Sequence, residues 1–281
     1  MSTIAPQTTV GPVHLTVADL ERSLRYYDEA VGLETLERGS GRASLGSAGR
    51  ELLMLVEEPG AKPAPGNTGL FHFALLVPER PALARWLAHA ARDRVSLSGL
   101  SDHRVSEAIY LRDPDYHGIE IYADRPRASW DGDVAEIMTT LPLDVDDLLA
   151  ELDDPEIEPF DRLADGTVMG HVHLQVSEIP STIAFYRDVL GFDLTAEIPQ
   201  AAFLSAGGYH HHIGGNTWQS AGAIPPATGS AALRHATILL PDAAERDRVA
   251  GAISDAGLQL EEGDGGPIVR DPSGNALLLA A

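Results

Sequence analysis

Histidine is the residue type in this chain best suited to chemistry. The sequence contains 11 histidines and no cysteine, which excludes thiolate metal sites, iron–sulfur clusters and a cysteine nucleophile. Any metal ion must therefore be bound by histidine, aspartate or glutamate. Three of the histidines are consecutive, at residues 210–212. In a strand their side chains would alternate between the two faces, which leaves open whether His211 or its two neighbours point inward.

The charge of the chain argues against two classes of partner. Its 42 acidic and 20 basic residues give a formal net charge of -22, so a phosphate backbone or an anionic bilayer would repel it. No run of residues approaches the roughly 18 apolar positions of a membrane span, and the first residues do not look like a secretory signal. We expect a cytoplasmic protein that binds neither nucleic acid nor a membrane.

The sequence contains a tandem duplication. Residues 13–33 match residues 172–192 without a gap. Two shorter segments of the first half also correspond to segments of the second half, 71–79 to 234–242 and 113–120 to 271–278. Only small insertions separate these matches, so we expect the two halves to share one fold.

Each half divides again into two smaller repeats. Every repeat starts with a short alternating apolar strand, continues with a helical pattern and ends with three strands. In the first repeat the strand covers 13–17, Asp19 is the predicted N-cap, and the helical spacing ends at Gly32. The pattern predicts an α+β fold of four βαβββ modules. We number them modules 1 to 4, and they begin near residues 13, 71, 172 and 235.

The modules predict two domains and a connecting segment. The N-terminal domain would cover residues 8–124 with modules 1 and 2, and the C-terminal domain would cover residues 167–281 with modules 3 and 4. The segment between them, residues 125–166, contains scattered prolines and many acidic residues. A short helix over 146–152 is expected in this linker, with its charges in solvent.

Several motifs connect the chain to a known family. His171 opens a segment of the form H-V-x-L-x-V, and residues 185–192 read F-Y-x-x-V-L-G-F. Residues 113–120 correspond to a D-P-x-G-N-x-x-E segment. These segments resemble the vicinal oxygen chelate superfamily, which includes glyoxalase I, bleomycin-resistance proteins and type I extradiol dioxygenases. Residues 105–127 and 205–218 are more narrowly similar to bacterial catechol-2,3-dioxygenase-like proteins.

The resemblance covers nearly the whole chain outside the linker, and it implies how the modules assemble. In this superfamily two modules pair so that their sheets close into a half-barrel, so four modules imply two open β-barrel-like domains. The family's metal ligands are the histidine that opens the first strand of a module and the glutamate that ends the D-P segment. Both project inward, because only alternate residues of a strand face the cavity.

Carried over to this sequence, the ligand positions are complete only when modules 2 and 3 are paired. Module 2 supplies His72 and Glu120, and module 3 supplies His171. Two histidines and one carboxylate leave coordination positions open and are typical of non-haem Fe(II) oxygenases. Modules 1 and 4 have Pro12 and Leu278 at ligand positions, so these two modules would form a second, metal-free barrel.

Alternatives remain open for these residues. If modules pair in chain order, His14 would join His72 and Glu120, although it is displaced by two residues, about 7 Å along a strand. Pairing of modules between subunits could also complete the site. Alternatively, His72 and His171 form hydrogen bonds within a barrel that binds no metal. Strand edges of open barrels often pair between copies, so a homodimer is one interpretation.

The resemblance implies a metal-dependent extradiol ring-cleaving dioxygenase that acts on a catechol-like aromatic substrate and O2. Fe(II), or alternatively Mn(II), would be bound by the three ligands of modules 2 and 3. His211 would act as acid and base, and Tyr110 and His103 would donate hydrogen bonds to oxygen atoms of the substrate. His103 would substitute for a further family histidine, whose position holds Ser101 here.

Two other classes of function are retained as alternatives. A glyoxalase-type lyase or isomerase normally uses four protein ligands with two carboxylates, and only Glu120 is evident here as an inward carboxylate. A non-catalytic small-molecule binder of the resistance type would hold an aromatic compound without a metal. The sequence neither identifies the substrate nor distinguishes iron from manganese, because the same nitrogen and oxygen ligands accept both.

Overall fold

The structure is a computed structural model that describes residues 3–130, 132, 134–155 and 159–281. By the contacts of its backbone the chain forms two compact units, which we call the first and the second unit. Three of the four unit boundaries fall inside strands, and the units do not follow the predicted domains 8–124 and 167–281, whose bounds stay a prediction. The first unit contains Met1–Thr16, Ala61–Phe71 and Gly170–Ala281, and the second contains Val17–Gly60 and His72–Met169.

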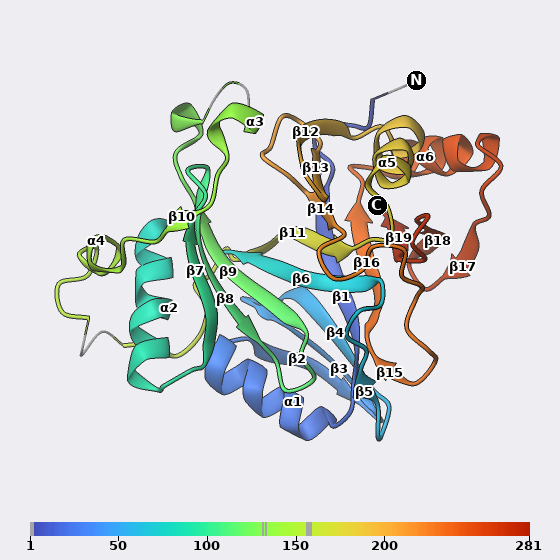
Figure 1. Cartoon of the computed structure of the whole chain (residues 1–281). Helices are drawn as coiled ribbons and strands as arrows, with labels where there is room; N and C mark the ends of the chain where they lie inside the picture. Colours follow the sequence, from blue (N-terminus) through green and yellow to red (C-terminus); the bar gives the residue numbers. More distant parts are fainter. Residues whose placement is uncertain (1–2, 131, 133, 156–158) are drawn as a thin grey trace. The chain divides into compact units, whose positions relative to one another are not determined.

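All four modules follow the predicted order of strand, helix and three strands, which confirms the α+β prediction. In Figure 1 they are coloured blue, then cyan to green, then yellow to light orange, then orange to red. Module 1 contains β1 (Thr9–Val17), α1 (Leu20–Tyr26), the π-helical turn η1 (Tyr27–Val31), β2 (Glu34–Gly39), β3 (Arg42–Ser47) and β4 (Arg50–Glu57). Module 2 contains β6 (Gly69–Leu76), α2 (Arg80–Arg92), β7 (Leu97–Asp102), β8 (Ser106–Arg112) and β9 (Gly118–Asp124).

The second half repeats these elements. Module 3 contains β11 (Val168–Gln175), α5 (Ile179–Ile183), the π-helical turn η3 (Ala184–Leu190), β12 (Asp193–Ile198), β13 (Ala201–Ser205) and β14 (Ile213–Asn216). Module 4 contains β16 (Leu233–Leu239), α6 (Ala243–Asp255), β17 (Glu261–Gly263), β18 (Gly266–Arg270) and β19 (Ala276–Ala280). Between the modules lie β5 (Lys62–Pro63), η2 (Arg127–Ser129), α3 (Val134–Ile137), β10 (Leu141–Pro142), α4 (Val145–Leu149) and β15 (Ser230–Ala231). Across the described part of the chain, we find no helix with the length and apolar character needed to cross a membrane.

The predicted helix signals of module 1 are both present. The Asp19 side chain accepts a hydrogen bond from the Arg22 backbone amide at 2.9 Å, as an N-cap does. Gly32 ends the helical segment with a φ of 87°, a left-handed conformation that glycine adopts without steric cost. The helix therefore begins and ends where the sequence indicated.

In the first unit, module 1 pairs with module 4. Strand β1 is antiparallel to β16, and His14 and His235 are partners in the register. Strand β16 also pairs with β19, in parallel. Strand β19 is antiparallel to β18, and β18 is antiparallel to β17. This is the pairing that the hypothesis of cross-half assembly requires for these two modules. In module 3, β14 lies between β11 and β13, parallel to the former and antiparallel to the latter.

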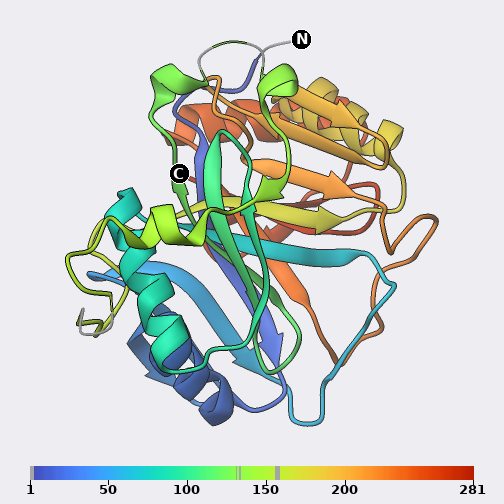
Figure 2. The same cartoon turned by 60° about the vertical axis from the view of Figure 1, so that its left-hand side comes forward.

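In the second unit, β6 and β9 are parallel neighbours within the sheet of module 2. Strands β8, β7 and β10 continue this sheet beyond β9. Helix α2 packs along the sheet, as Figures 1 and 2 show. Its Trp86 is fully buried and donates the indole N–H to the carbonyl oxygen of Val31 at 3.1 Å, so the helix is also tied to module 1.

The linker helix α4 overlaps the predicted range 146–152, and its acidic side chains Asp146 and Asp147 are exposed to solvent. Arg80 donates to Asp147 Oδ2 at 2.6 Å and to Glu151 Oε1 at 2.7 Å. The same guanidinium donates to the buried carboxylate of Glu107 at 2.6 Å. The acidic face is therefore exposed to solvent, as expected, although Arg80 on α2 forms ion pairs with Asp147 and Glu151 at its edge.

A buried tyrosine–aspartate hydrogen bond joins the helical segment of module 1 to a turn of module 2. Tyr27 donates its hydroxyl to Asp113 Oδ2 at 3.0 Å. Asp113 Oδ1 accepts from the backbone amides of Asp115 and His117 at 2.9 and 2.8 Å. Burial raises the pKa of Tyr27 well above its ordinary value, so the phenol stays protonated and donates. We call this contact the tyrosine–aspartate brace.

The second half contains the same brace. Tyr186 donates to Asp271 Oδ2 at 3.2 Å, and Asp271 Oδ1 accepts from the amides of Ser273 and Asn275 at 2.8 and 2.9 Å. The F-Y and D-P motifs of the sequence are therefore the two ends of one contact in this half. The D-P segments are turns, as expected, and a tyrosine holds each turn in place.

We predict that Tyr27→Phe and Tyr186→Phe each lower the free energy of unfolding by about 1–3 kcal/mol. The ring volume is retained, but a buried carboxyl group loses its hydrogen-bond donor. Urea unfolding followed by circular dichroism measures the effect. Tyr116→Phe is the matched control, because the side chain of Tyr116 is 67% exposed. A loss no larger than that of the control would contradict the role of the brace.

Candidate metal centre

His72 and Glu120 form the part of the centre that lies in the second unit. Strands β6 and β9 are parallel, and Ala74 is the register partner of Glu120. Because strand residues alternate, His72 and Ala74 have the same orientation, which places the imidazole on the side of the carboxylate. His72 Nε2 lies 3.0 Å from Glu120 Oε2, and both side chains are buried.

Tyr110 lies beside this pair. It is the register partner of Glu120 on strand β8, and its ring centroid is 5.6 Å from that of His72. Burial raises the pKa of Tyr110 well above its ordinary value, and the negative charge of Glu120 raises it further. The phenol is therefore protonated at neutral pH and is a hydrogen-bond donor within the site.

His103 contacts the same phenol. Its Nε2 lies 2.8 Å from the Tyr110 hydroxyl, and its Nδ1 lies 2.7 Å from the carbonyl oxygen of Thr139. A carbonyl oxygen only accepts, so Nδ1 carries the proton. In the neutral imidazole Nε2 is then an acceptor, and Tyr110 donates to it. In this tautomer His103 orients the tyrosine hydroxyl.

The three consecutive histidines belong to the first unit and lie in the loop before β14. Residues 207 and 208 are glycines with φ values of 61° and 71°, conformations that do not continue strand β13. The expectation that the histidines lie in a strand was therefore wrong, and strand alternation does not govern their orientation. The side chains of His210, His211 and His212 are nevertheless all buried.

Each of these histidines has a different neighbour. The ring centroid of His211 lies 4.1 Å from that of His171 on β11. Nδ1 of His210 lies 2.8 Å from Nδ1 of His211, so one of these two nitrogens is protonated and the other is not. Nδ1 of His212 accepts from the backbone amide of Ala206 at 3.1 Å. Burial, followed by the neighbouring His210 and His171, lowers the pKa of His212 to about 3.

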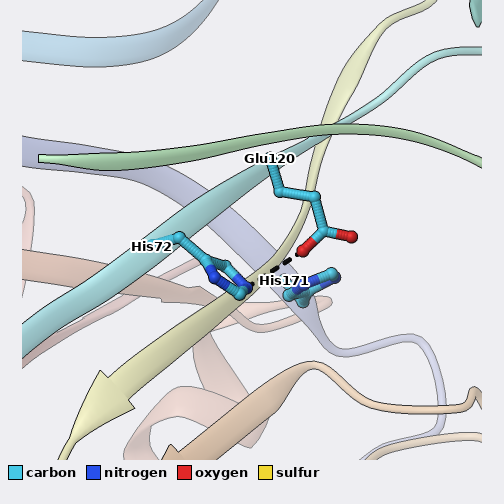
Figure 3. Close-up of side chains that lie close together, drawn as sticks. All are labelled: His72, Glu120 and His171. Carbon is cyan, nitrogen blue, oxygen red and sulfur yellow. Dashed lines mark ion pairs between the residues drawn. The ribbon is translucent and has the colours of Figure 1, made fainter. Parts of the chain in front are cut away.

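The predicted metal ligands form a group. One potential ligand atom from each of His72, Glu120 and His171 lies within 4.8 Å of the other two, and all three side chains are buried (Figure 3). Among the described residues, no further group of three histidine or carboxylate ligands meets this spacing. The donors are two imidazoles and one carboxylate, which suits Fe(II) or Mn(II).

The alternative ligand His14 is not in this group. Its ring lies against His235, with the centroids 3.9 Å apart. The contact between His210 and His211 was not anticipated from the sequence, although the two residues are adjacent. The carbonyl of Thr139 as partner of His103 had no sequence signal, because every residue has a carbonyl oxygen.

The chain is similar to known proteins over nearly its whole length. A sequence profile of the Glyoxalase/Bleomycin resistance protein/Dioxygenase superfamily matches residues 9–121 and 168–279. The chain is 41% identical over 285 residues to catechol-2,3-dioxygenase of Bacillus subtilis strain 168, with 99% of both chains covered.

Solved structures share the fold at low sequence identity. Glyoxalase I from Zea mays is similar with a TM-score of 0.59 and 16% identity, covering 97% of this chain and 92% of that chain. The cppA protein from Streptococcus pneumoniae is similar with a TM-score of 0.56 and 16% identity, covering 97% of this chain and 98% of that chain. At these identities the likeness concerns the fold alone.

We predict that the protein purified without oxygen contains about one iron or manganese ion per chain. His72→Ala, His171→Ala and Glu120→Ala should each reduce this content severalfold, because each removes one of three ligands. Elemental analysis by mass spectrometry measures the content. His14→Ala should keep the wild-type metal content. If His14→Ala loses the metal and His171→Ala retains it, the chain-order pairing is favoured.

Proposed function

Because the chain belongs to the glyoxalase/bleomycin resistance protein/dioxygenase superfamily, we propose that it is an extradiol dioxygenase that cleaves the ring of a catechol-like aromatic compound. The observation that carries the proposal is the buried group of His72, Glu120 and His171. The 41% identity to a catechol-2,3-dioxygenase over the full length supports the same activity.

The proposed metal is Fe(II), with Mn(II) as the alternative. A metal ion held by three protein ligands would have further coordination positions open. These positions would accept the two substrate oxygens and O2. The ligand group contains one carboxylate, whereas glyoxalase-type sites normally use two. This donor set favours the dioxygenase over the lyase or isomerase alternative.

His211 is the proposed acid and base. Its ring lies beside that of His171. A substrate held by a metal ion at His171 would therefore lie within reach of His211. His211 would take a proton from a substrate hydroxyl and later return one to a product oxygen. The Nδ1 contact with His210 fixes opposite tautomers on the two rings. If His211 donates in that contact, its proton is on Nδ1, and the lone pair on Nε2 would accept the substrate proton.

Tyr110 is the proposed hydrogen-bond donor to an oxygen of the substrate or product. Its phenol is protonated and lies beside His72 and Glu120. The phenol has one proton, which it donates to His103 Nε2 in this structure, so Tyr110 would donate to the substrate only after turning this proton away from His103. To donate to the substrate itself, His103 would have to be protonated on Nε2, so we assign it first to the orientation of Tyr110.

We predict that the Fe(II)-loaded protein consumes one O2 per catechol and yields a ring-opened product that contains both oxygen atoms. An oxygen electrode measures the uptake, and mass spectrometry after reaction with 18O2 counts the incorporated atoms. Glu120→Gln should abolish the reaction while the variant remains folded. Glu29→Gln, on an exposed glutamate, is the matched control and should retain full activity.

Other outcomes point to the alternatives. Binding of catechol without O2 uptake by the metal-loaded protein would favour the non-catalytic binder. Isomerisation of a thiol adduct of an α-ketoaldehyde, again without O2 uptake, would favour the glyoxalase type.

We predict that His211→Phe lowers kcat by about 10²- to 10⁴-fold, the range expected for loss of a general acid–base group, with the metal content unchanged. His210→Phe should lower kcat by a smaller factor, because it removes only the partner of His211 Nδ1. His210→Asn retains a polar atom near the Nδ1 position and should restore part of the loss. Steady-state kinetics on the metal-loaded variants test this. Wild-type kcat in His211→Phe would exclude the acid–base role.

A further inference from the structure

A row of aromatic rings extends from the proposed acid–base residue. We call it the aromatic row, and its members, all in the first unit, are His211, Phe203, His173, Trp218 and Phe71. The ring centroid of Phe203 lies 5.1 Å from that of His211 and 5.7 Å from that of His173. The ring centroid of Trp218 lies 5.6 Å from that of His173 and 5.3 Å from that of Phe71. The row is therefore continuous from His211 to Phe71.

The aromatic row lies on the face of the module 3 sheet that carries the proposed ligand His171. Gly214 on β14 is the register partner of His173 on β11 and of Phe203 on β13, so both side chains flank it on one face. A Cβ at Gly214 would lie 2.9 Å from Cγ of His173, so the absence of a side chain there makes room for this ring. His173 follows His171 by two residues and has the same orientation, about 7 Å further along the strand. A molecule bound at His171 that extends along β11 would therefore meet the row.

The row passes from the interior of the first unit to its surface. Phe203 and His173 are buried, Phe71 is half-buried, and Trp218 is 46% exposed. Tryptophan side chains are highly buried on average, and covering apolar surface that faces water is favourable. The outer end of the row thus has apolar ring surface that a bound molecule would cover.

We propose that the aromatic row determines which substituent the substrate carries, and that the preferred substrate is a catechol with an apolar aryl group. This inference rests on the proposed function, because it takes His171 and His211 as the place where the substrate hydroxyls bind. The aryl group would lie against His173 and Trp218. Aromatic rings in edge-to-face or offset geometry stabilise one another, and burial of their surfaces adds to this stabilisation.

The composition of the row disfavours a charged substituent. Its members include no lysine, arginine, aspartate or glutamate. A carboxylate held against these rings would lose its hydration, and the row has no basic side chain of lysine or arginine to pair with it. We therefore expect a phenyl-substituted catechol to be preferred over a carboxylate-substituted one.

Steady-state kinetics of the Fe(II)-loaded protein test this specificity. The quantity compared is kcat/KM for the better of 3-phenylcatechol and 4-phenylcatechol, divided by kcat/KM for 3,4-dihydroxybenzoate. Trp218→Ala should lower this ratio about tenfold, because one aromatic contact and its buried area are lost. Trp218→Phe should lower it less, since a smaller ring remains. Leu258→Ala is the matched control and should keep the wild-type ratio, because Leu258 is an apolar side chain of the same unit that is 38% exposed.

Binding of 2-hydroxybiphenyl separates this proposal from the proposed activity. The compound has an aryl group but only one hydroxyl, so it is not a substrate for cleavage next to two hydroxyls. Its Kd, measured by isothermal titration calorimetry, should rise about tenfold in Trp218→Ala and stay unchanged in Leu258→Ala. If this holds although no catechol is cleaved, the row binds aryl groups and the dioxygenase activity is wrong. If catechols are cleaved but Trp218→Ala changes neither the Kd nor the kinetic ratio, the role of the row is overturned.

Circular dichroism shows whether the Trp218 variants fold. If they do not, wild-type crystals soaked in 2-hydroxybiphenyl decide the question. Electron density for the unsubstituted ring in contact with His173 and Trp218 would support the proposal. Density for the compound elsewhere only, or none, would overturn it.

Discussion

The hydrogen bond from Tyr27 to Asp113 positions the strand that carries the proposed carboxylate ligand. It closes the turn at residues 113–117, and β9 begins immediately afterwards at Gly118. The parallel register of β9 with β6 then places Glu120 beside His72. A shift of one residue in either strand would turn one of these side chains to the opposite face. The ligand pair thus depends on a contact that is itself remote from the metal.

Much of the fold could be predicted because it follows from local rules that act four times. Alternation within strands, the N-cap at Asp19 and the glycine end at Gly32 define one module, and duplication extends the same prediction to the others. The proposed metal ligands could also be predicted from the sequence. The resemblance to the family carried its ligand positions onto His72, Glu120 and His171 of modules 2 and 3, and these side chains lie together.

The remaining features depend on packing that has no local signal. The histidines at 210–212 leave strand geometry after two positive-φ glycines, and in this loop Nδ1 of His210 contacts Nδ1 of His211. Arg80 of module 2 forms ion pairs with Asp147 of α4 and with Glu151 just beyond this helix. In each case the deciding partner is distant in sequence or reached through a loop whose path the pattern of apolar residues does not define.

The contact between His103 and the carbonyl oxygen of Thr139 depends on the length of the segment between β9 and β10, and not on its amino-acid sequence. Every amino acid presents the same carbonyl group, so the side chain at this position is free to change during evolution without loss of the hydrogen bond. An insertion or deletion between β9 and β10, in contrast, would move the carbonyl away from the imidazole and release the tyrosine that His103 holds. We therefore expect related proteins to vary in the sequence of this segment while its length before β10 is maintained.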